Sequence, residues 1–375
     1  MNPGALLGDD PSVDGVDVAV YTVPTDAPEG DGTLTWSSTT LVLVRAHCGD
    51  TVGLGYTYGA PATAPVVTDQ LAPVVTGRCV WDVPGANEAM HRALRNAGRP
   101  GVAAGALSAV DIALWDLKAR LLGLPLVRLL GASRTTVPVY GSGGFTTYDD
   151  EQQHRQLRGW VEEQGIPRVK IKIGASWGRE ERRDRERVAR ARRAIGDDAE
   201  LYVDANGAYS VKQAVRLARH LDGQGVTWLE EPVSSDDLPG LARIRDATAT
   251  DVAAGEYGYT LSYFGHMLDA GAVDCLQADV TRCGGITVWL RVAALAEAAG
   301  LPVSGHCAPH LHAHAAAAVP NIRHLEWFHD HVRIERLLFD GVLDPGGGSI
   351  RPGASGEPGL GLTLRQEAAE PYRIS

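Results

Sequence analysis

Two of the four lysines in this Arg-rich chain stand one residue apart in the apolar run Val169-Lys170-Ile171-Lys172-Ile173-Gly174. Alternation of apolar and polar residues predicts a β-strand, on which side chains at positions i and i+2 share one face. Both ammonium groups therefore point the same way. If the apolar face packs under helices, the lysine face lines an enclosed space, where an unpaired cation is costly. We therefore expect carboxylates nearby; the alternative is an edge strand with solvated lysines.

Three carboxylates follow at a constant interval. Asp204, Glu230 and Glu256 are separated by 26 residues each (204 to 230 and 230 to 256), the length of one strand-and-helix unit. Consecutive strands would bring the three side chains to one level, where they cannot all stay ionised without a cation. Oxygen-only ligands with open positions suit Mg²⁺, for which Mn²⁺ could substitute.

The elements that must position these residues form a repeat. From about residue 137 onward, a short apolar strand, a turn and a helix recur. The predicted strands are residues 137–140, 168–173, 200–204, 227–230, 251–255, 275–279, 302–306 and 323–327. Eight strands alternating with helices predict an α/β fold, a (β/α)8 TIM barrel, with its active site at the C-terminal ends of the strands. Ionisable residues at or just past strand ends are Asp204, Glu230, Glu256, Asp279, His306 and Glu326.

The N-terminal region follows a different pattern. Residues 16–57 predict strands interrupted by a polar loop at 24–32, and helices follow around 87–96 and 107–122. On the second helix, Asp111 and Asp116 are expected to form a helix-end or interdomain salt bridge. The Gly- and Pro-rich tail at 344–361 is too irregular for another barrel unit and is expected to fold back onto the N-terminal region.

Composition limits the class of partner. A net charge of −11 over 375 residues argues against a nucleic-acid or anionic-membrane surface and favours a small-molecule partner. The five cysteines show no CxxC spacing, so neither a disulfide framework nor a structural zinc site is expected. The start Met1-Asn2-Pro3-Gly4 lacks a signal-peptide pattern, and no window holds about 18 uninterrupted apolar residues. We expect a cytoplasmic protein that forms a symmetric homo-oligomer.

These motifs together resemble the enolase superfamily, mandelate racemase subgroup. The residues that carry the resemblance are Lys170-x-Lys172, Val203-Asp204-Ala205-Asn206, Trp228-Leu229-Glu230-Glu231-Pro232, Gly255-Glu256, Asp279 with Gly284-Gly285, His306, Glu326 and the helix around Ser108–Leu117. The resemblance covers nearly the whole chain. It implies a modified, enolase-like barrel over residues 135–343, an α+β capping domain over 1–134 with loops above the active site, and a segment, 344–375, that returns to the capping domain.

The resemblance also implies which residues bind the metal ion and which residue removes the substrate proton. Asp204, Glu230 and Glu256 would bind Mg²⁺. Lys172 would be the base on one face of a carboxylate substrate. Lys170 would contact the substrate carboxylate and lower the pKa of Lys172.

On the opposite face, the resemblance implies that His306 serves as the second acid-base group, oriented by Asp279. Glu326, if protonated, would donate a hydrogen bond to the enediolate oxygen. Asn206 would contact the substrate, and Tyr21 and Trp36 are further substrate-binding candidates from the region of the 24–36 loop.

The expected reaction removes the proton α to a carboxylate and passes through an enediolate. Loss of a β-hydroxyl would then give a 2-keto-3-deoxy acid, whereas reprotonation from the other face would racemise or epimerise a 2-hydroxy acid. We favour dehydration of an acid sugar, because such dehydratases are common among proteins of this resemblance and the loop carries polar groups such as Thr25, Asp26 and Asp31. Tyr21 and Trp36 could instead favour an aromatic hydroxy acid.

Three rival functions remain open. The run His310, His312 and His314 could indicate a metal-dependent hydrolase on the same barrel, although such enzymes carry their His-x-His pair on the first strand. A glycosidase also places paired carboxylates on a barrel, but has no need of two buried lysines. A catalytically inactive binding protein would not need the bases.

Overall fold

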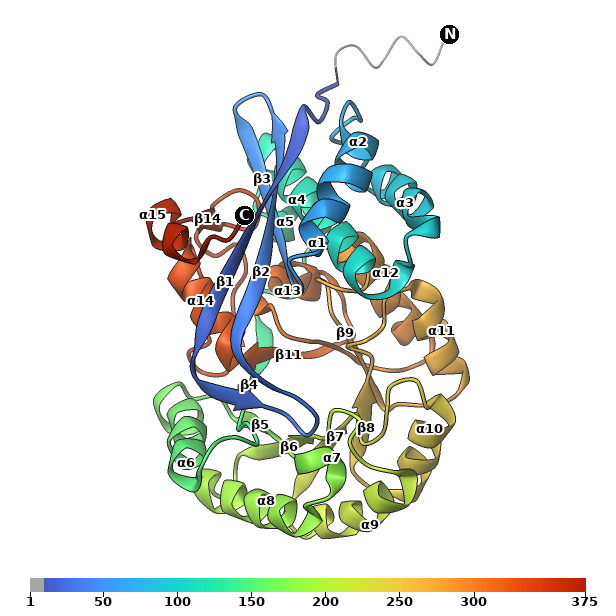
Figure 1. The fold of residues 1–375 in the computed structure, drawn as a ribbon, viewed down its shortest axis with the longest axis vertical. Coiled ribbons are helices and arrows are strands. Elements are labelled where there is room, and N and C mark those ends of the chain that lie inside the picture. Colours follow the sequence, from blue (N-terminus) through green and yellow to red (C-terminus); the bar gives the residue numbers. More distant parts are fainter. Residues whose placement is uncertain (1–9) are drawn as a thin grey trace.

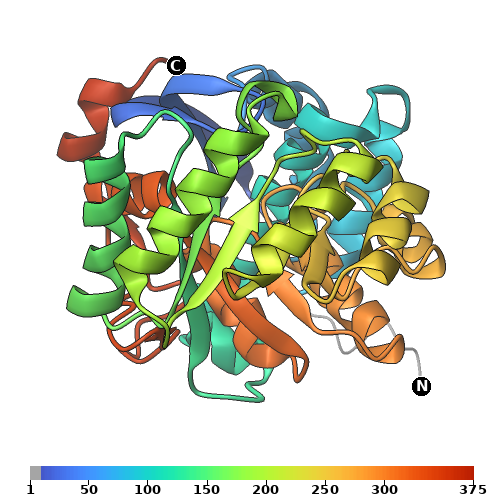
Figure 2. The same cartoon turned by 90° about the horizontal axis from the view of Figure 1, so that it is seen from below.

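Eight parallel strands form a closed barrel at the centre of the molecule, since the last strand, β11, pairs with the first, β4 (Figure 1). The computed structural model describes residues 10–375; the N-terminal start considered above for a signal peptide lies outside the described residues. Figure 2 shows the barrel from below, with its helices around it. The barrel strands are β4 Val137–Gly143, β5 Arg168–Lys172, β6 Glu200–Asp204, β7 Val226–Glu230, β8 Asp251–Ala254, β9 Cys275–Ala278, β10 Val303–Gly305 and β11 Ile322–Phe328.

All eight predicted strands are present and the barrel prediction is confirmed. The apolar side chains of β5, Val169 and Ile171, are buried toward the surrounding helices. The helices that follow the strands are α6 Asp150–Arg158, α7 Ala175–Gly178, α8 Glu181–Ile195, α9 Val211–Asp222, α10 Leu238–Ala247, α11 Leu261–Asp269, α12 Gly285–Ala298, α13 Pro309–Ala318 and α14 His329–Leu338.

The N-terminal residues form a three-stranded antiparallel sheet packed on helices. Its strands are β1 Gly15–Gly30, β2 Thr35–Cys48 and β3 Thr51–Tyr58, and its helices are α1 Thr63–Val66, α2 Ala72–Val75, α3 Val83–Ala93, α4 Ala104–Leu121 and α5 Leu126–Leu130. Helix α4 lies directly against β3, because a side chain on Gly55 would come within 2.3 Å of the Ala109 carbonyl oxygen. The stretch Arg99–Leu121 is long and apolar enough to cross a bilayer, yet 78% of its apolar window is buried inside the protein.

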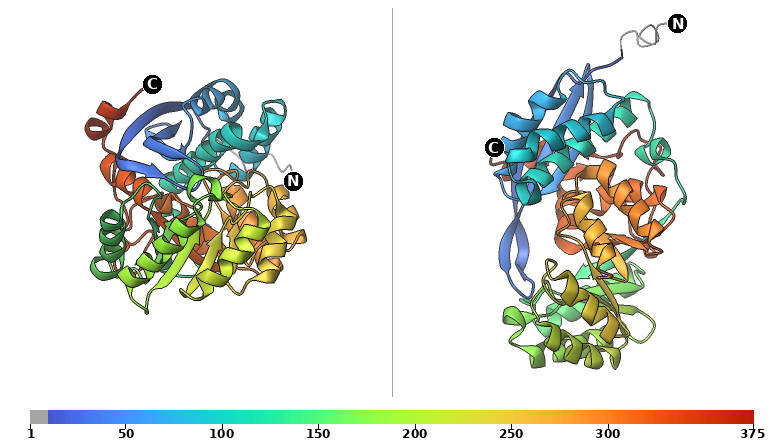
Figure 3. Two further views of the ribbon diagram at one scale, coloured as in Figure 1. Left: turned by 60° about the horizontal axis from the view of Figure 1, so that its bottom comes forward. Right: turned by 90° about the vertical axis from the view of Figure 1, so that its right-hand side faces the viewer.

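The polar loop predicted at 24–32 is instead the end of strand β1 and the start of the turn that joins β1 to β2 in a long β-hairpin. Strands β1 and β2 extend from the sheet down to the barrel mouth (Figure 1; Figure 3, right). Their register breaks between Pro24 and Glu29, and β1 is an edge strand, so prolines are tolerated there. At the tip, a side chain on Gly32 would meet the Ile173 carbonyl oxygen at 2.7 Å, so the tip lies close against the end of β5.

The C-terminal tail returns to the N-terminal sheet. The Val20 amide donates to the carbonyl oxygen of Ser375, and the Ile374 amide donates to the carbonyl oxygen of Val20. The short elements of this part are β12 Phe339–Asp340, β13 Ser349–Ile350, β14 Thr363–Leu364 and α15 Gln366–Ala369. β13 pairs with β4 and β14 with β12, so the tail also contacts the barrel.

The two aspartates of α4 tie this helix to other parts of the chain. Asp116 forms the predicted salt bridge, with Arg120 at 2.6 Å, and also accepts the amide of Leu360 in the tail at 2.6 Å. For Asp111 the salt-bridge prediction is wrong, since no cation contacts it among the described residues. It accepts hydrogen bonds from Asn87 Nδ2 at 2.7 Å and from the hydroxyl and amide of Thr287 on α12.

Asp111 makes stability depend on pH. Burial raises its pKa to about 7, although the hydrogen bonds from Thr287 and Asn87 act in the opposite direction. An unfolded Asp loses its proton near pH ~4, so the folded chain holds a proton that the unfolded chain has lost, and this contribution disappears as the pH rises to about 7. In urea unfolding, the stability of the wild type relative to Asp111→Asn should therefore fall between about pH 5 and 7, by at most about 1.4 kcal/mol per pH unit, and then level off. A difference independent of pH would mean that Asp111 is ionised throughout.

Candidate active site

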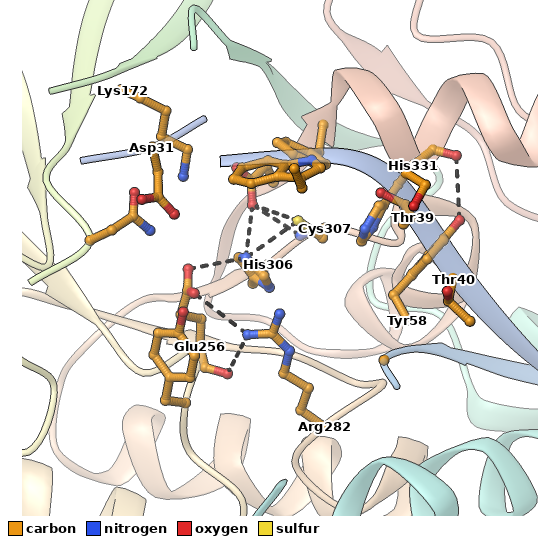
Figure 4. A pocket seen from close by; sticks show the side chains of 17 residues that line it. Asp31, Thr39, Thr40, Tyr58, Lys172, Glu256, Arg282, His306, Cys307 and His331 are labelled. Carbon is orange, nitrogen blue, oxygen red and sulfur yellow. Dashed lines mark hydrogen bonds and ion pairs between the residues drawn. The ribbon is translucent and has the colours of Figure 1, made fainter. Parts of the chain in front are cut away.

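A pocket of about 390 Å³ opens where the C-terminal ends of the barrel strands meet the β1–β2 hairpin (Figure 4). Lys172, Glu256, His306 and Glu326 from the barrel all contribute to its lining. The hairpin supplies one wall, including Trp36. Two of the acids, one base and the histidine predicted from the sequence are therefore brought to one pocket by strands far apart in the chain.

The three carboxylates spaced by 26 residues form a compact cluster. Asp204, Glu230 and Glu256 each offer an oxygen, and these oxygens lie within 4.8 Å of one another, on side chains that are all buried. Burial and the charge of Asp204 raise the pKa of Glu230 to about 8, despite the ammonium group of Lys170. The oxygen-only donor set of the cluster fits a divalent cation such as Mg²⁺.

Lys170 is enclosed by this cluster and by the end of β11. Its Nζ donates to Glu230 Oε1 at 2.6 Å and lies 2.8 Å from Glu326 Oε1, and the residue has no exposed surface. Burial disfavours its charge, but Glu230 and Glu326 raise its pKa well above the usual range. Lys170 does not line the pocket, so the structure gives it the part of a neutralising cation rather than the substrate contact that the sequence predicts.

Lys172 reaches the pocket and contacts Asp204. Burial and Lys170 lower its pKa, as predicted, but Asp204 and Glu256 raise it more. The prediction of a lowered pKa counted burial, Lys170 and the bound metal; among the groups of this chain alone, the direct contact with Asp204 reverses the direction.

His306 approaches the pocket from a different side than Lys172 (Figure 4). Its Nδ1 lies 2.8 Å from Asp279 Oδ2, the pairing expected from the sequence, and its Nε2 lies 3.0 Å from Glu256 Oε2. Burial alone would disfavour the imidazolium, but the carboxylates of Glu256 and Glu326 and the hydrogen bond to Asp279 raise the pKa of His306 well above its usual value. His306 therefore holds a proton at neutral pH.

Glu326 is predicted above as a protonated donor, and the structure contradicts this. Burial would favour the neutral acid, but Lys170, His306 and Lys172 hold the pKa of Glu326 below its usual range. Its oxygens accept hydrogen bonds from the Ser142 hydroxyl at 2.6 Å and from the Cys307 amide at 3.0 Å. An ionised, acceptor-only Glu326 cannot donate to a substrate oxygen.

The three substrate-binding candidates separate into two groups. Trp36 and Asn206 line the pocket, and Asn206 carries a buried Oδ1 without a hydrogen-bond partner. Their contact with a substrate stays a prediction. The prediction for Tyr21 is wrong: the residue is 1% exposed, packs in the same apolar cluster as Leu41, and does not reach the pocket.

Several residues of the site were missed from the sequence. Arg282 lines the pocket and contacts both Glu256 at 3.5 Å and Asp279 at 3.4 Å; its position three residues after Asp279 was the available signal. Cys307 follows His306 in a left-handed conformation, with φ of 51°, and its Sγ lies 3.3 Å from His306 Nε2. No sequence motif predicts Cys307 as a residue of the site.

The hydroxyl groups of the pocket wall were also missed. Ser38, Thr39 and Thr40 on β2 line the pocket beside Tyr58 on β3. Of the polar loop residues considered above, Asp31 lines the pocket, but its Oδ1 already accepts the amides of Thr33 and Leu34 in the hairpin turn.

The histidine run on α13 has structural partners. His310 Nδ1 lies 2.5 Å from Glu335, His312 Nε2 accepts the Val280 amide at 2.9 Å, and His314 Nδ1 accepts the Val127 amide at 3.1 Å. Within residues 10–375, none of the three belongs to a cluster of potential metal ligands. The geometry therefore gives no support to the hydrolase hypothesis.

A capped barrel with clustered carboxylates between a lysine and a histidine defines an enolase-type enzyme. Residues 152–368 match the family model described as enolase C-terminal domain-like, and residues 16–131 match the N-terminal domain of mandelate racemase and muconate lactonizing enzyme. The chain belongs to this family.

Relatives and solved structures agree with this assignment. The chain is 35% identical over 337 residues, covering 86% of it and 89% of the relative, to 3,6-anhydro-alpha-L-galactonate cycloisomerase of Streptomyces coelicolor. It is 53% identical to a mandelate racemase/muconate lactonizing enzyme-like protein from Rubrobacter xylanophilus, with a TM-score of 0.93 over 97% of this chain and 100% of the other. L-talarate/galactarate dehydratase from Salmonella typhimurium, liganded with Mg and L-lyxarohydroxamate, is 28% identical, with a TM-score of 0.89 over 100% of this chain and 95% of the other.

Proposed function

We propose that this enzyme is a magnesium-dependent acid-sugar dehydratase. It removes the proton from the carbon next to a carboxylate, giving an enediolate, and expels the β-hydroxyl as water, so that the enol product becomes a 2-keto-3-deoxy acid. The observation that carries the proposal is the entry of Lys172 and His306 into one pocket from different sides (Figure 4). Both residues lie beside a buried cluster of three carboxylates.

Asp204, Glu230 and Glu256 are the residues proposed to hold Mg²⁺, or Mn²⁺ in its place. When bound, the ion would offset their negative charge and stabilise the charge that develops on the substrate carboxylate. Relatives of this chain include a dehydratase solved with Mg. Lys170 supports the cluster by holding Glu230 and Glu326 in place.

Lys172 is the proposed base and His306 the proposed acid. Once Asp204 engages a cation, the contact that raises the pKa of Lys172 is weakened, while burial and Lys170 still lower it. His306, charged and fixed at Nδ1 by Asp279, would give its Nε2 proton to the departing hydroxyl group. Arg282, paired with Glu256 and Asp279, holds both of these carboxylates in place.

The hydroxyl groups of the pocket support a polyhydroxylated substrate. Ser38, Thr39, Thr40 and Tyr58 present donors and acceptors on the side of the pocket formed by β2 and β3. Curated relatives named for acid-sugar chemistry include the cycloisomerase and the dehydratase described above. A small-molecule carboxylate with several hydroxyls is therefore the proposed substrate, and we further propose a cytoplasmic homo-oligomer.

Racemisation or epimerisation of a 2-hydroxy acid is the second candidate. It is favoured by the same pair of residues, since a base and a charged acid on two sides of a carbanion could exchange a proton across it. Incubation with acid sugars and hydroxy acids in the presence of Mg²⁺ separates the two. Keto-acid formation without stereochemical scrambling supports the dehydratase, and loss of optical rotation without keto product would contradict it.

Replacing Glu230 by glutamine should abolish activity at ordinary Mg²⁺ concentrations. The change removes one charged ligand and leaves Lys170 with one fewer carboxylate, so we expect Mg²⁺ affinity to fall by about a hundredfold. Calorimetric titration of Mg²⁺ into both proteins measures this. Glu335→Gln is not a suitable comparison because Glu335 binds His310 and Tyr56 in the core; Glu297→Gln, on the exposed end of α12, should leave the affinity unchanged.

A further inference from the structure

A second group of potential metal ligands lies where the hairpin meets α14, and the proposed reaction uses none of its members. Asp26 and Glu29 belong to β1, and His329 is the first residue of α14. Each offers one ligand atom, and these atoms lie within 4.8 Å of one another. We call these three residues the hairpin cluster. Its members come from the capping hairpin and from the barrel, 303 residues apart in the case of Asp26 and His329.

Glu29 has an unsatisfied oxygen inside the protein. The residue has no exposed surface, and its Oε2 accepts a hydrogen bond from Trp36 Nε1 at 2.9 Å. Among residues 10–375, no group donates a hydrogen bond to its Oε1. A buried carboxylate oxygen left without a partner carries a substantial free-energy cost. The orphaned oxygen, on a side chain whose neighbours are an imidazole and a second carboxylate, indicates that a ligand belongs there.

The local charge also favours a dication. Asp330, next to His329 and fully buried, has an Oδ2 that lacks a partner, while its Oδ1 lies 2.6 Å from Arg333. Arg333 also donates to the Pro24 carbonyl oxygen at 2.7 Å. One guanidinium thus serves the three carboxyl groups of Asp26, Glu29 and Asp330, and burial together with the charge of Asp330 raises the pKa of Glu29 to about 9, so Glu29 would release its proton when a cation binds.

We propose that the hairpin cluster binds a second divalent metal ion, of the transition-metal class represented by Zn²⁺, with water completing the coordination. One imidazole nitrogen and two carboxylates form a donor set that Zn²⁺ accepts, whereas the catalytic cluster offers oxygen alone. His329 Nε2 lies 3.0 Å from Asp26 Oδ2, and ion binding would replace this contact and release any proton shared between the two groups.

The ion would fasten the hairpin to the barrel. Glu29 also holds Trp36, whose ring lines the substrate pocket and packs edge-on against Phe145 with centroids 5.7 Å apart. A cation on Glu29 therefore fixes the pocket wall through Trp36. Amide hydrogen exchange of residues 25–36 should slow when Zn²⁺ binds.

The test measures the number of Zn²⁺ ions bound to the full chain by equilibrium dialysis with metal analysis. Excess Mg²⁺ is present so that Mg²⁺ competes with Zn²⁺ for the catalytic carboxylates. The wild type should bind one more equivalent of Zn²⁺ than His329→Gln or Asp26→Asn. Affinity at this site should fall on the order of a hundredfold in either variant. Asp26 is half-exposed, so its variant keeps the test valid if His329→Gln fails to fold.

The matched control is His47→Gln. His47 also pairs with an aspartate, Asp17, at 2.6 Å on the N-terminal sheet, but no third ligand joins them within the described part of the chain. This variant should bind as much Zn²⁺ as the wild type, and hydrogen exchange at 25–36 should still respond. Equal Zn²⁺ content in wild type and His329→Gln would overturn the proposal, as would loss of Zn²⁺ in His47→Gln. Because no turnover is measured, failure of the dehydratase proposal leaves this result intact.

Discussion

Substituting Lys172 by methionine should lower the rate of product formation by about 10²- to 10⁴-fold, the range that a general base typically contributes. The methionine side chain has similar length but no proton acceptor. Exchange of the substrate α-hydrogen with solvent D₂O, followed by NMR, should disappear together with turnover, because both need the proton to leave carbon. Mg²⁺ binding should persist, since the change removes a cation from Asp204 and takes away no proposed ligand.

Two further variants test whether the loss of activity is due to the loss of the base at position 172. Lys172→Arg keeps a positive charge beside Asp204 but cannot act as a base at neutral pH, so it should be as inactive as the methionine variant. Lys212→Met removes an exposed lysine on α9 and should have no effect. Substantial activity in Lys172→Arg would assign the lysine an electrostatic role and would contradict the proposed base.

The barrel could be predicted from the sequence because its signals are local. Each strand is short, apolar and bounded by turn residues, and the strand predicted at 200–204 has those limits in the structure. The carboxylate cluster followed from the same regularity, since residues one strand-and-helix unit apart end neighbouring strands. Asp204 and Glu230 are register partners in the sheet, which is why equal spacing placed them together.

The hairpin and its contacts could not be predicted in this way. Pro24 and Pro28 argue locally against a strand, and only the edge position of β1 permits them. Which face of β1 carries Tyr21 depends on its pairing with β2, and that pairing turns the ring into the core. Glu29 and His329 lie close together only because of how the hairpin packs on the barrel. No local sequence pattern predicts this tertiary packing.

The protonation states of the site were the least predictable feature, because they depend on distances of a few ångströms. An acidic pocket predicts a neutral Glu326, but Lys170 lies 2.8 Å from its Oε1 and keeps it ionised. Burial, the second lysine and a bound metal together predict a lowered pKa for Lys172, but among the groups of the chain alone the contact with Asp204 reverses the direction. Spacing identifies which groups meet, whereas the sign of each shift depends on which partner is nearest.

Substituting His306 by asparagine should separate the two halves of the proposed reaction. Without its acid, expulsion of the β-hydroxyl should slow by about 10³-fold, while Lys172 still removes the α-proton. Solvent deuterium should therefore continue to enter the substrate, within about tenfold of the wild-type rate, although little keto acid forms. His154→Asn, an exposed change on α6, is the control and should leave both rates unchanged.

The opposite pattern would reassign the roles of the two residues. If His306→Asn stops deuterium entry and Lys172→Met retains it, the histidine is the base. The charges around His306 argue against this outcome, because the carboxylates of Glu256 and Glu326, together with the hydrogen bond to Asp279, raise its pKa against the effect of burial and keep the ring protonated. A protonated imidazole has no lone pair with which to accept the α-proton. The same proton is available to a leaving hydroxyl group, so His306 fits the acid in elimination.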